Sequence, residues 1–72
     1  LQVGAAVEEI DILDLKGRMA QTDRQDILMV YANLKTGSEN HLQAFVNNLQ
    51  RQRFEYRPEY LSLKEYDGII HG

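Results

Sequence analysis

The sequence predicts an all-α chain, in which an antiparallel hairpin of two long helices is built to sit in a four-helix bundle and is followed by a short helix. Three observations predict this architecture. Apolar residues recur at helical spacing along most of the chain. A single proline is present among the 72 residues, and only a short polar link separates the two long helical patterns, which is typical of antiparallel neighbours.

Composition excludes several classes of function. The net charge is −3, with 43% hydrophobic residues and no cysteine, so the chain is too apolar for a disordered segment and has no disulfide or thiolate metal site. Its basic residues are scattered, whereas nucleic-acid binding needs a basic stripe. No apolar run is long enough to span a membrane, and no signal peptide is recognisable. We therefore expect a cytoplasmic protein that contacts neither nucleic acid nor membrane.

The first helix is expected over residues 1–20. Helical steps of about 100° place two apolar stripes on it, and a helix that is apolar on two sides is usually buried between neighbours. The broad stripe contains Leu1, Ala5, Ala6, Ile12, Leu13, Met19 and Ala20, and the second contains Val3, Val7 and Ile10.

The second helix is expected over residues 24–52, with Thr22 or Asp23 as its N-cap. Its apolar seam has the spacing of a bundle helix, widened by Val30 and Leu42. Gly37 interrupts the helix, which indicates close approach of another helix. The seam consists of Ile27, Tyr31, Leu34, Ser38, His41, Phe45 and Leu49.

Residues 54–70 are expected to form an aromatic strap and a short helix. Phe54, Tyr56, Pro58 and Tyr60 alternate in an extended pattern, and we interpret the tyrosines as covers for the apolar ends of the bundle. The capping box that begins at Ser62 marks the start of the short helix.

His41 and Glu9 are the residues most able to carry chemistry. The seam directs His41 into the bundle, either as a core histidine bonded to Ser38 or another polar partner, or as a metal ligand. Glu9 lies in the broad apolar stripe, where an unpaired carboxylate is costly to bury, so we expect it to be neutralised by a cation or to be exposed. Glu8 points about 100° away and is expected to be solvated or salt-bridged.

A dinuclear metal site offers one interpretation of these residues. Carboxylate-bridged di-iron and di-manganese bundles take one Glu from each of two helices and a Glu-x-x-His pair from each of the other two. The chain offers a Glu helix and then a His helix, but Ser38 stands where that pair would have its glutamate. The pattern is half present, and no catalytic residue follows from it.

Three separated motifs resemble a ferritin-like family of uncharacterised proteins, domain of unknown function 2202. Residues 3–15 (VGAAVEEIDILDL) are similar to its third-helix region, residues 37–45 (GSENHLQAF) to its fourth helix, and residues 56–62 (YRPEYLS) to its C-terminal strap. The resemblance implies that residues 1–72 are the C-terminal half of a ferritin-like domain. By the same resemblance, Glu9 is the carboxylate ligand of the third helix, with Glu8 as the alternative, and His41 is the histidine ligand of the fourth.

Two functions remain open from the sequence. The first is a ferritin-like module that binds iron or manganese through Glu9 and His41, with weaker candidates at Glu8 and Ser38. The second is a structural or interaction module that has lost the metal, which Ser38 favours. In both, the hairpin needs a partner, either the missing N-terminal half of the domain or a second copy, and the chain alone is expected to form a homo-oligomer.

Overall fold

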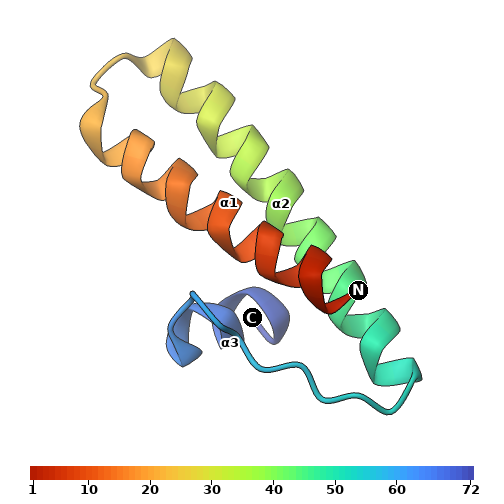
Figure 1. Ribbon diagram of the computed structural model, residues 1–72. Helices are drawn as coiled ribbons and strands as arrows, with labels where there is room; N and C mark the ends of the chain where they lie inside the picture. The colour runs from red at the N-terminus through yellow and green to blue at the C-terminus, as the bar shows by residue number, and fades with distance from the viewer.

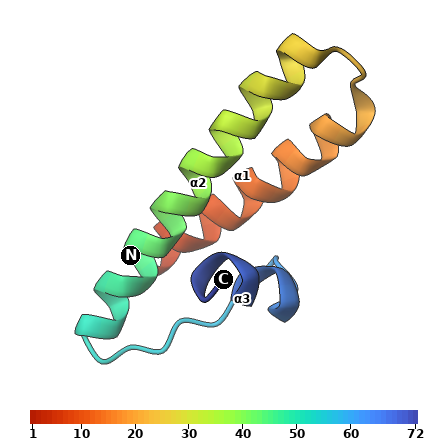
Figure 2. The same cartoon turned by 180° about the vertical axis from the view of Figure 1, so that it is seen from behind.

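The computed structural model describes all 72 residues as three helices without a β-strand: α1 (Gln2–Gln21), α2 (Gln25–Arg51) and α3 (Leu63–Ile70). Helices α1 and α2 lie side by side and antiparallel (Figures 1 and 2). The all-α prediction is confirmed. None of the helices is long and apolar enough to cross a membrane.

The link between α1 and α2 differs from the prediction in its capping. Helix α2 has Arg24 at its N-cap, with no side-chain cap hydrogen bond. The Thr22 hydroxyl accepts a long contact from the Arg24 backbone N–H, at 3.5 Å, and so lies before the cap position. The expected cap at Thr22 or Asp23 is therefore wrong, because the link stays extended for one or two residues more. Asp26 does lie in the first turn, where a negative charge is favourable.

The strap, defined here as residues 52–62, reverses the chain after α2. Arg53 takes a left-handed conformation, with φ of 63°, and the following Phe54 N–H donates back to the Leu49 carbonyl at 2.9 Å. This is the geometry that ends many helices. The strap then returns alongside α1 and leads into α3, whose start at Ser62 is confirmed: the Ser62 hydroxyl accepts from the Glu65 N–H at 3.1 Å.

The core lies between the hairpin, the strap and α3, on one side of the hairpin (Figure 1). From α1, the side chains of Ala5 and Ile12 are buried in this core. Phe45 of α2 and Ile69 and Ile70 of α3 are partly buried and pack against it. The remaining buried apolar residues are Leu42, Val46 and Leu49 of α2, Tyr56 and Leu61 of the strap, and Tyr66 of α3.

The other side of the hairpin, which we call the open face, is uncovered. Leu34 and Val30 are more than half exposed, and His41 is exposed as well. The expected seam is therefore covered only near its C-terminal end, where Leu42 and Leu49 are buried and Phe45 packs against the core. It is open at Leu34 and His41. The physical reason is that the strap and α3 cover only one side of the hairpin.

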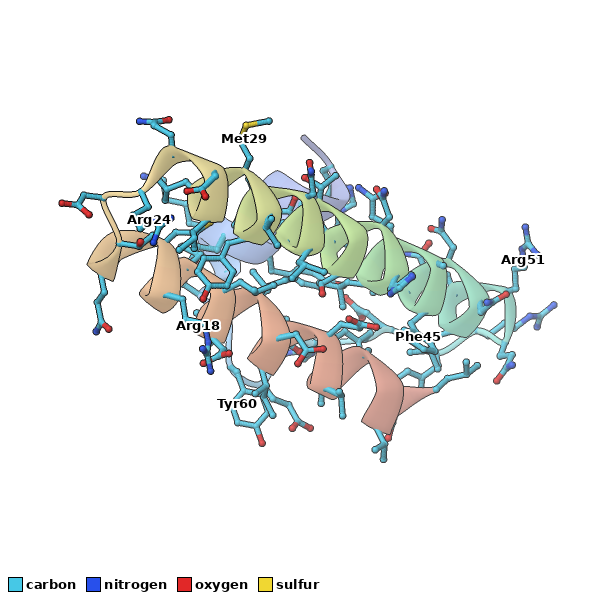
Figure 3. All side chains as sticks on the ribbon, turned by 90° about the horizontal axis from the view of Figure 1, so that it is seen from above. Arg18, Arg24, Met29, Phe45, Arg51 and Tyr60 are labelled. Atoms are coloured by element: carbon cyan, nitrogen blue, oxygen red, sulfur yellow. The ribbon has the colours of Figure 1, made fainter.

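Of two glycines in the hairpin, Gly4 marks a close approach of the helices and Gly37 does not. A Cβ atom on Gly4 would lie 2.8 Å from the Phe45 ring, so this glycine lets the ring rest directly on α1. Phe45 extends from α2 toward α1, whereas Met29 points away from the hairpin (Figure 3). A Cβ on Gly37 would meet nothing within 4 Å. The close approach expected at Gly37 is thus absent within these 72 residues.

Candidate functional site: a buried carboxylate and an open groove

Glu9 is the one buried charged residue, with none of its surface exposed. It sits one turn after Ala5 and one turn before Ile12, in the apolar stripe of α1 that faces the strap. Its position in that stripe is as the sequence predicts. Hydrogen-bond donors of the strap surround the buried carboxylate.

The strap supplies donors from one side chain and three successive backbone amides. The Tyr56 hydroxyl donates to Glu9 Oε2. The N–H groups of Tyr60 and Leu61 each donate to Oε1 at 2.9 Å, and the Glu59 N–H lies 3.1 and 3.2 Å from the two oxygens. Both carboxylate oxygens are thus satisfied, which is the condition under which a buried charge is stable.

Burial and the negative charge of Glu9 raise the pKa of two neighbouring tyrosines. Burial, followed by the hydrogen bond and negative charge of Glu9, raises the pKa of the Tyr56 phenol above its usual 10.0. Burial and then the Glu9 charge also raise the pKa of Tyr66, whose ring centroid lies 6.1 Å from that of Tyr56. Both phenols are therefore held neutral, and Tyr56 remains a donor.

Glu8 lies on a different side of α1, next to His41 of α2. The distance from Glu8 Oε2 to His41 Nδ1 is 3.2 Å, with the Glu8 side chain 14% exposed and that of His41 69% exposed. They meet in a groove of about 450 Å³ between α1 and α2 on the open face. We call it the interhelical groove; it is lined by Glu8, Asp11, Asp14, Leu15, Asn33, Leu34, Gly37, Ser38 and His41.

The structure therefore separates the two residues that the sequence predicted to act together. Glu9 faces the strap and does not line the interhelical groove, whereas His41 meets the weaker candidate Glu8. Ser38 lines the groove. Nowhere do three or more His, Cys, Asp or Glu side chains gather in an arrangement that could hold a metal ion.

Sequence reasoning missed the partners of Glu9. The Tyr56 hydroxyl and the amides of residues 59–61 are 47 to 52 positions away in the chain, and backbone amides carry no sequence signal. The one available sign was Pro58, which cannot donate a backbone hydrogen bond and breaks helical structure. It indicates an irregular segment whose neighbouring amides need acceptors.

Comparison with known proteins assigns the family. The sequence model of the family described as "Uncharacterized protein domain (DUF2202)" matches residues 1–72, and the chain belongs to this family. It is 47% identical over 70 residues to the uncharacterized protein MJ0754 of Methanocaldococcus jannaschii, a match that covers 97% of this chain and 38% of that protein.

A solved structure is similar as well. The crystal structure of the hypothetical protein MJ0754 from Methanococcus jannaschii DSM 2661 matches with a TM-score of 0.93 and 45% sequence identity, over 99% of this chain and 41% of that one. The 72 residues thus span about two fifths of the length of the relative.

Proposed function

We propose that this member of the DUF2202 family is the C-terminal half of a ferritin-like helical domain, and that its interhelical groove carries half of a carboxylate–histidine site for iron or manganese. The observation that supports the metal site is the approach of the Glu8 carboxylate to the His41 imidazole, at 3.2 Å. In this proposal Glu8 takes the role that the sequence gave to Glu9, since the oxygens of Glu9 already accept four donors from the strap.

The exposed apolar residues of the open face support the proposal that the hairpin belongs to a four-helix bundle. Val7 lies one helical turn before Asp11 of the groove, and Val30 one turn before Leu34, so both extend the groove along the same face. They are 48% and 56% exposed, respectively, although residues of this kind at helical spacing normally pack against other helices. More than half of the relative lies outside the matched segment. We propose that two further helices from that part of the domain cover this face.

The donor atoms suit the proposed metals. Imidazole nitrogen and carboxylate oxygen are ligands for iron, manganese and zinc, and a metal at this position would supply Lewis-acid or redox chemistry. The chain's own residues would hold it: Glu8 as an anionic ligand, and His41 through its neutral imidazole, which must lose any bound proton first. The covering helices would provide the remaining ligands, because Ser38 offers no carboxylate.

Metal titration of the chain and of its longer homologue MJ0754 tests the site. We expect Mn(II) or Fe(II) to bind, and Glu8→Gln or His41→Gln to weaken binding by at least about tenfold, the scale on which even outer-shell residues act. Glu39→Gln is the matched control, because Glu39 pairs with Lys35 at 2.9 Å and does not line the groove. Equal affinity in the His41→Gln and unchanged proteins would eliminate the groove as the site.

Ser38 favours a second function. A bundle that has replaced the glutamate of the Glu-x-x-His pair can keep its helices as a structural or interaction module without metal. In this case stability would not depend on metal, and added Mn(II) would leave the melting temperature unchanged. A bound metal would raise it, so the two functions predict opposite results in the same experiment.

The open face also predicts the behaviour of the 72 residues alone. Without covering helices, the exposed apolar residues favour association of two copies through this face. Sedimentation should therefore detect an oligomer, and Leu34→Lys should shift it to the monomer. A monomer at high concentration would contradict this part of the proposal.

A further inference from the structure

Glu8 and Glu9 are consecutive but serve different sides of α1. A helical step of about 100° separates their side chains. Glu9 is fully buried against the strap, while Glu8 lies in the interhelical groove beside His41. Any rotation of α1 about its axis therefore moves both carboxylates at once. The hydrogen bonds that hold the Glu9 carboxylate therefore also constrain the position of the Glu8 carboxylate.

The attachment of Glu9 is directional, unlike the rest of the packing around it. Ala5 and Ile12 are buried on the same stripe, but apolar burial is non-directional and tolerates small rotations. Hydrogen bonds weaken steeply as their angles depart from linear. Glu9 receives one hydroxyl and three backbone amides at once, so its carboxylate fits in only one orientation.

We propose that Glu9 is a positioning residue: its attachment to the strap fixes the rotation of α1 and thereby holds Glu8 against His41. The expected effect of Glu9 on metal binding rests on the proposed function of the groove, whereas its effect on the rotation of α1 does not. A Glu carboxylate lies about 6 Å from the helix axis, so a rotation of only about 20° displaces it by about 2 Å. That is enough to break a contact of 3.2 Å.

The strap donors that hold Glu9 form a carboxylate-binding loop. In a Glu9→Ala variant, the Tyr56 hydroxyl and the amides of residues 59–61 would surround a cavity without an acceptor. Formate has the carboxylate of Glu9 and no side-chain stem, so it fits the vacated place. We therefore expect formate to bind in the Glu9→Ala variant and to order the strap again, although it cannot restore the covalent link to α1.

Formate binding to Glu9→Ala distinguishes a positioning role of Glu9 from a purely stabilising one. If the strap only needs an acceptor, formate restores the folded strap in Glu9→Ala. If Glu9 positions α1 through its own side chain, the strap folds with formate while the alignment of positions 8 and 41 does not recover. A shortened link, Glu9→Asp, should give an intermediate alignment, because its carboxylate reaches the loop only if α1 shifts.

The alignment can be measured without any metal. The chain contains no cysteine, so a Glu8→Cys/His41→Cys pair introduces the only two thiols. Their rate of cross-linking by a short thiol-specific reagent reports how well positions 8 and 41 face each other. We expect the rate to fall at least about tenfold when Glu9→Ala is added, and to stay low in formate even where circular dichroism and strap fluorescence show that the fold has returned. Ile12→Ala, a buried apolar residue on the same stripe, should leave the rate within about twofold in its folded fraction.

Mn(II) affinity in the background without cysteines is the second measurement. Glu9→Ala in formate should bind about 10–100-fold more weakly than the unchanged chain, as loss of an outer-shell contact does elsewhere. An equal cross-linking rate in folded Glu9→Ala, or full recovery in formate, would overturn the positioning role. Should Glu9→Ala not fold even in formate, the same comparison is made with Tyr56→Phe and Glu9→Gln, which leave part of the attachment in place.

The two proposals fail in different ways. If the unchanged chain and MJ0754 bind no Mn(II) while the cross-linking rate still depends on Glu9, the metal function is wrong and the positioning role stands. If Mn(II) binds through Glu8 and His41 with equal affinity in folded Glu9→Ala, the metal function stands and the positioning role is wrong.

Discussion

Replacing Glu9 by glutamine keeps the shape of a fully buried side chain and removes its charge. The resulting loss of stability follows from the hydrogen bonds that the carboxylate accepts in the unchanged protein. If the amide oxygen takes the place of Oε1, the N–H groups of Tyr60 and Leu61 keep an acceptor, at 2.9 Å in the unchanged protein. The new NH₂ group takes the place of Oε2 and forces the Tyr56 hydroxyl to accept instead of donate.

The magnitude follows from the difference between charged and neutral hydrogen bonds. Bonds to a charged group contribute about 1.5–3 kcal/mol and neutral ones about 1 kcal/mol. Three backbone amides lose this assistance, so the free energy of unfolding should fall by about 2 kcal/mol. For a domain of this size that corresponds to a melting temperature lower by roughly 10 °C.

Urea and thermal unfolding, followed by circular dichroism in the presence of a chelator, measure this loss. Glu8→Gln is the matched control, since it removes the same charge from the neighbouring residue, where the contact with the exposed His41 contributes at most about 1 kcal/mol. A Glu9→Gln variant within about 0.5 kcal/mol of the unchanged chain would refute the reasoning. Under the alternative, in which a metal neutralises Glu9, the metal-free stability would not fall.

Other changes give distinct results. Gly4→Ala should lower the free energy of unfolding by about 1 kcal/mol, because its Cβ would meet an aromatic ring at 2.8 Å; Gly17→Ala, with nothing within 4 Å, should raise it by about 1 kcal/mol, and thermal melts distinguish the two. The pKa of Tyr56 is raised in the folded state, so its contribution to stability is full below pH 10 and is lost as the pH rises further; Tyr56→Phe should flatten this alkaline loss in urea unfolding at a series of pH values. Lys16, which is paired with Glu65, lowers the pKa of that carboxyl from its usual 4.5, so the pair stabilises the fold above that pH and loses its effect on acidification. Because both side chains are partly exposed, Glu65→Gln should lower the free energy of unfolding by no more than about 0.5 kcal/mol at neutral pH. If the Glu65→Gln variant loses stability on acidification as steeply as the unchanged chain, the pairing of Glu65 with Lys16 does not account for the acid dependence.

The predicted helices and the observed ones agree closely because their signals are local. The sequence predicts helices over residues 1–20 and 24–52, and the structure has Gln2–Gln21 and Gln25–Arg51. The capping box at Ser62 was read correctly for the same reason, since Ser62 and Glu65 are three residues apart. The N-cap of α2 was wrong by one or two positions, because both Thr22 and Asp23 are good caps and the choice depends on how the link is stretched between the helices.

The site was harder to predict because it depends on rotation of the helices. Helical spacing correctly placed Glu9 within the apolar stripe of α1, but it could not identify what neutralises a buried carboxylate. For α2 it predicted a single inner seam that runs from Ile27 to Leu49 and includes His41. The strap and α3 cover only the part of α2 around Leu42 and Val46, which leaves His41 on the open face.

The sequence by itself determined the helical class, the extents of the two long helices, the start of the short one, the hairpin link and the presence of a carboxylate in an apolar stripe, because all of these follow from spacing within a few residues. Only the tertiary structure decided that the strap amides hold Glu9 and that Glu8, not Glu9, meets His41. These contacts join residues that are 33 to 52 positions apart, and their geometry depends on how each helix is turned about its axis. A rotation of one residue step, about 100°, is enough to exchange the two carboxylates.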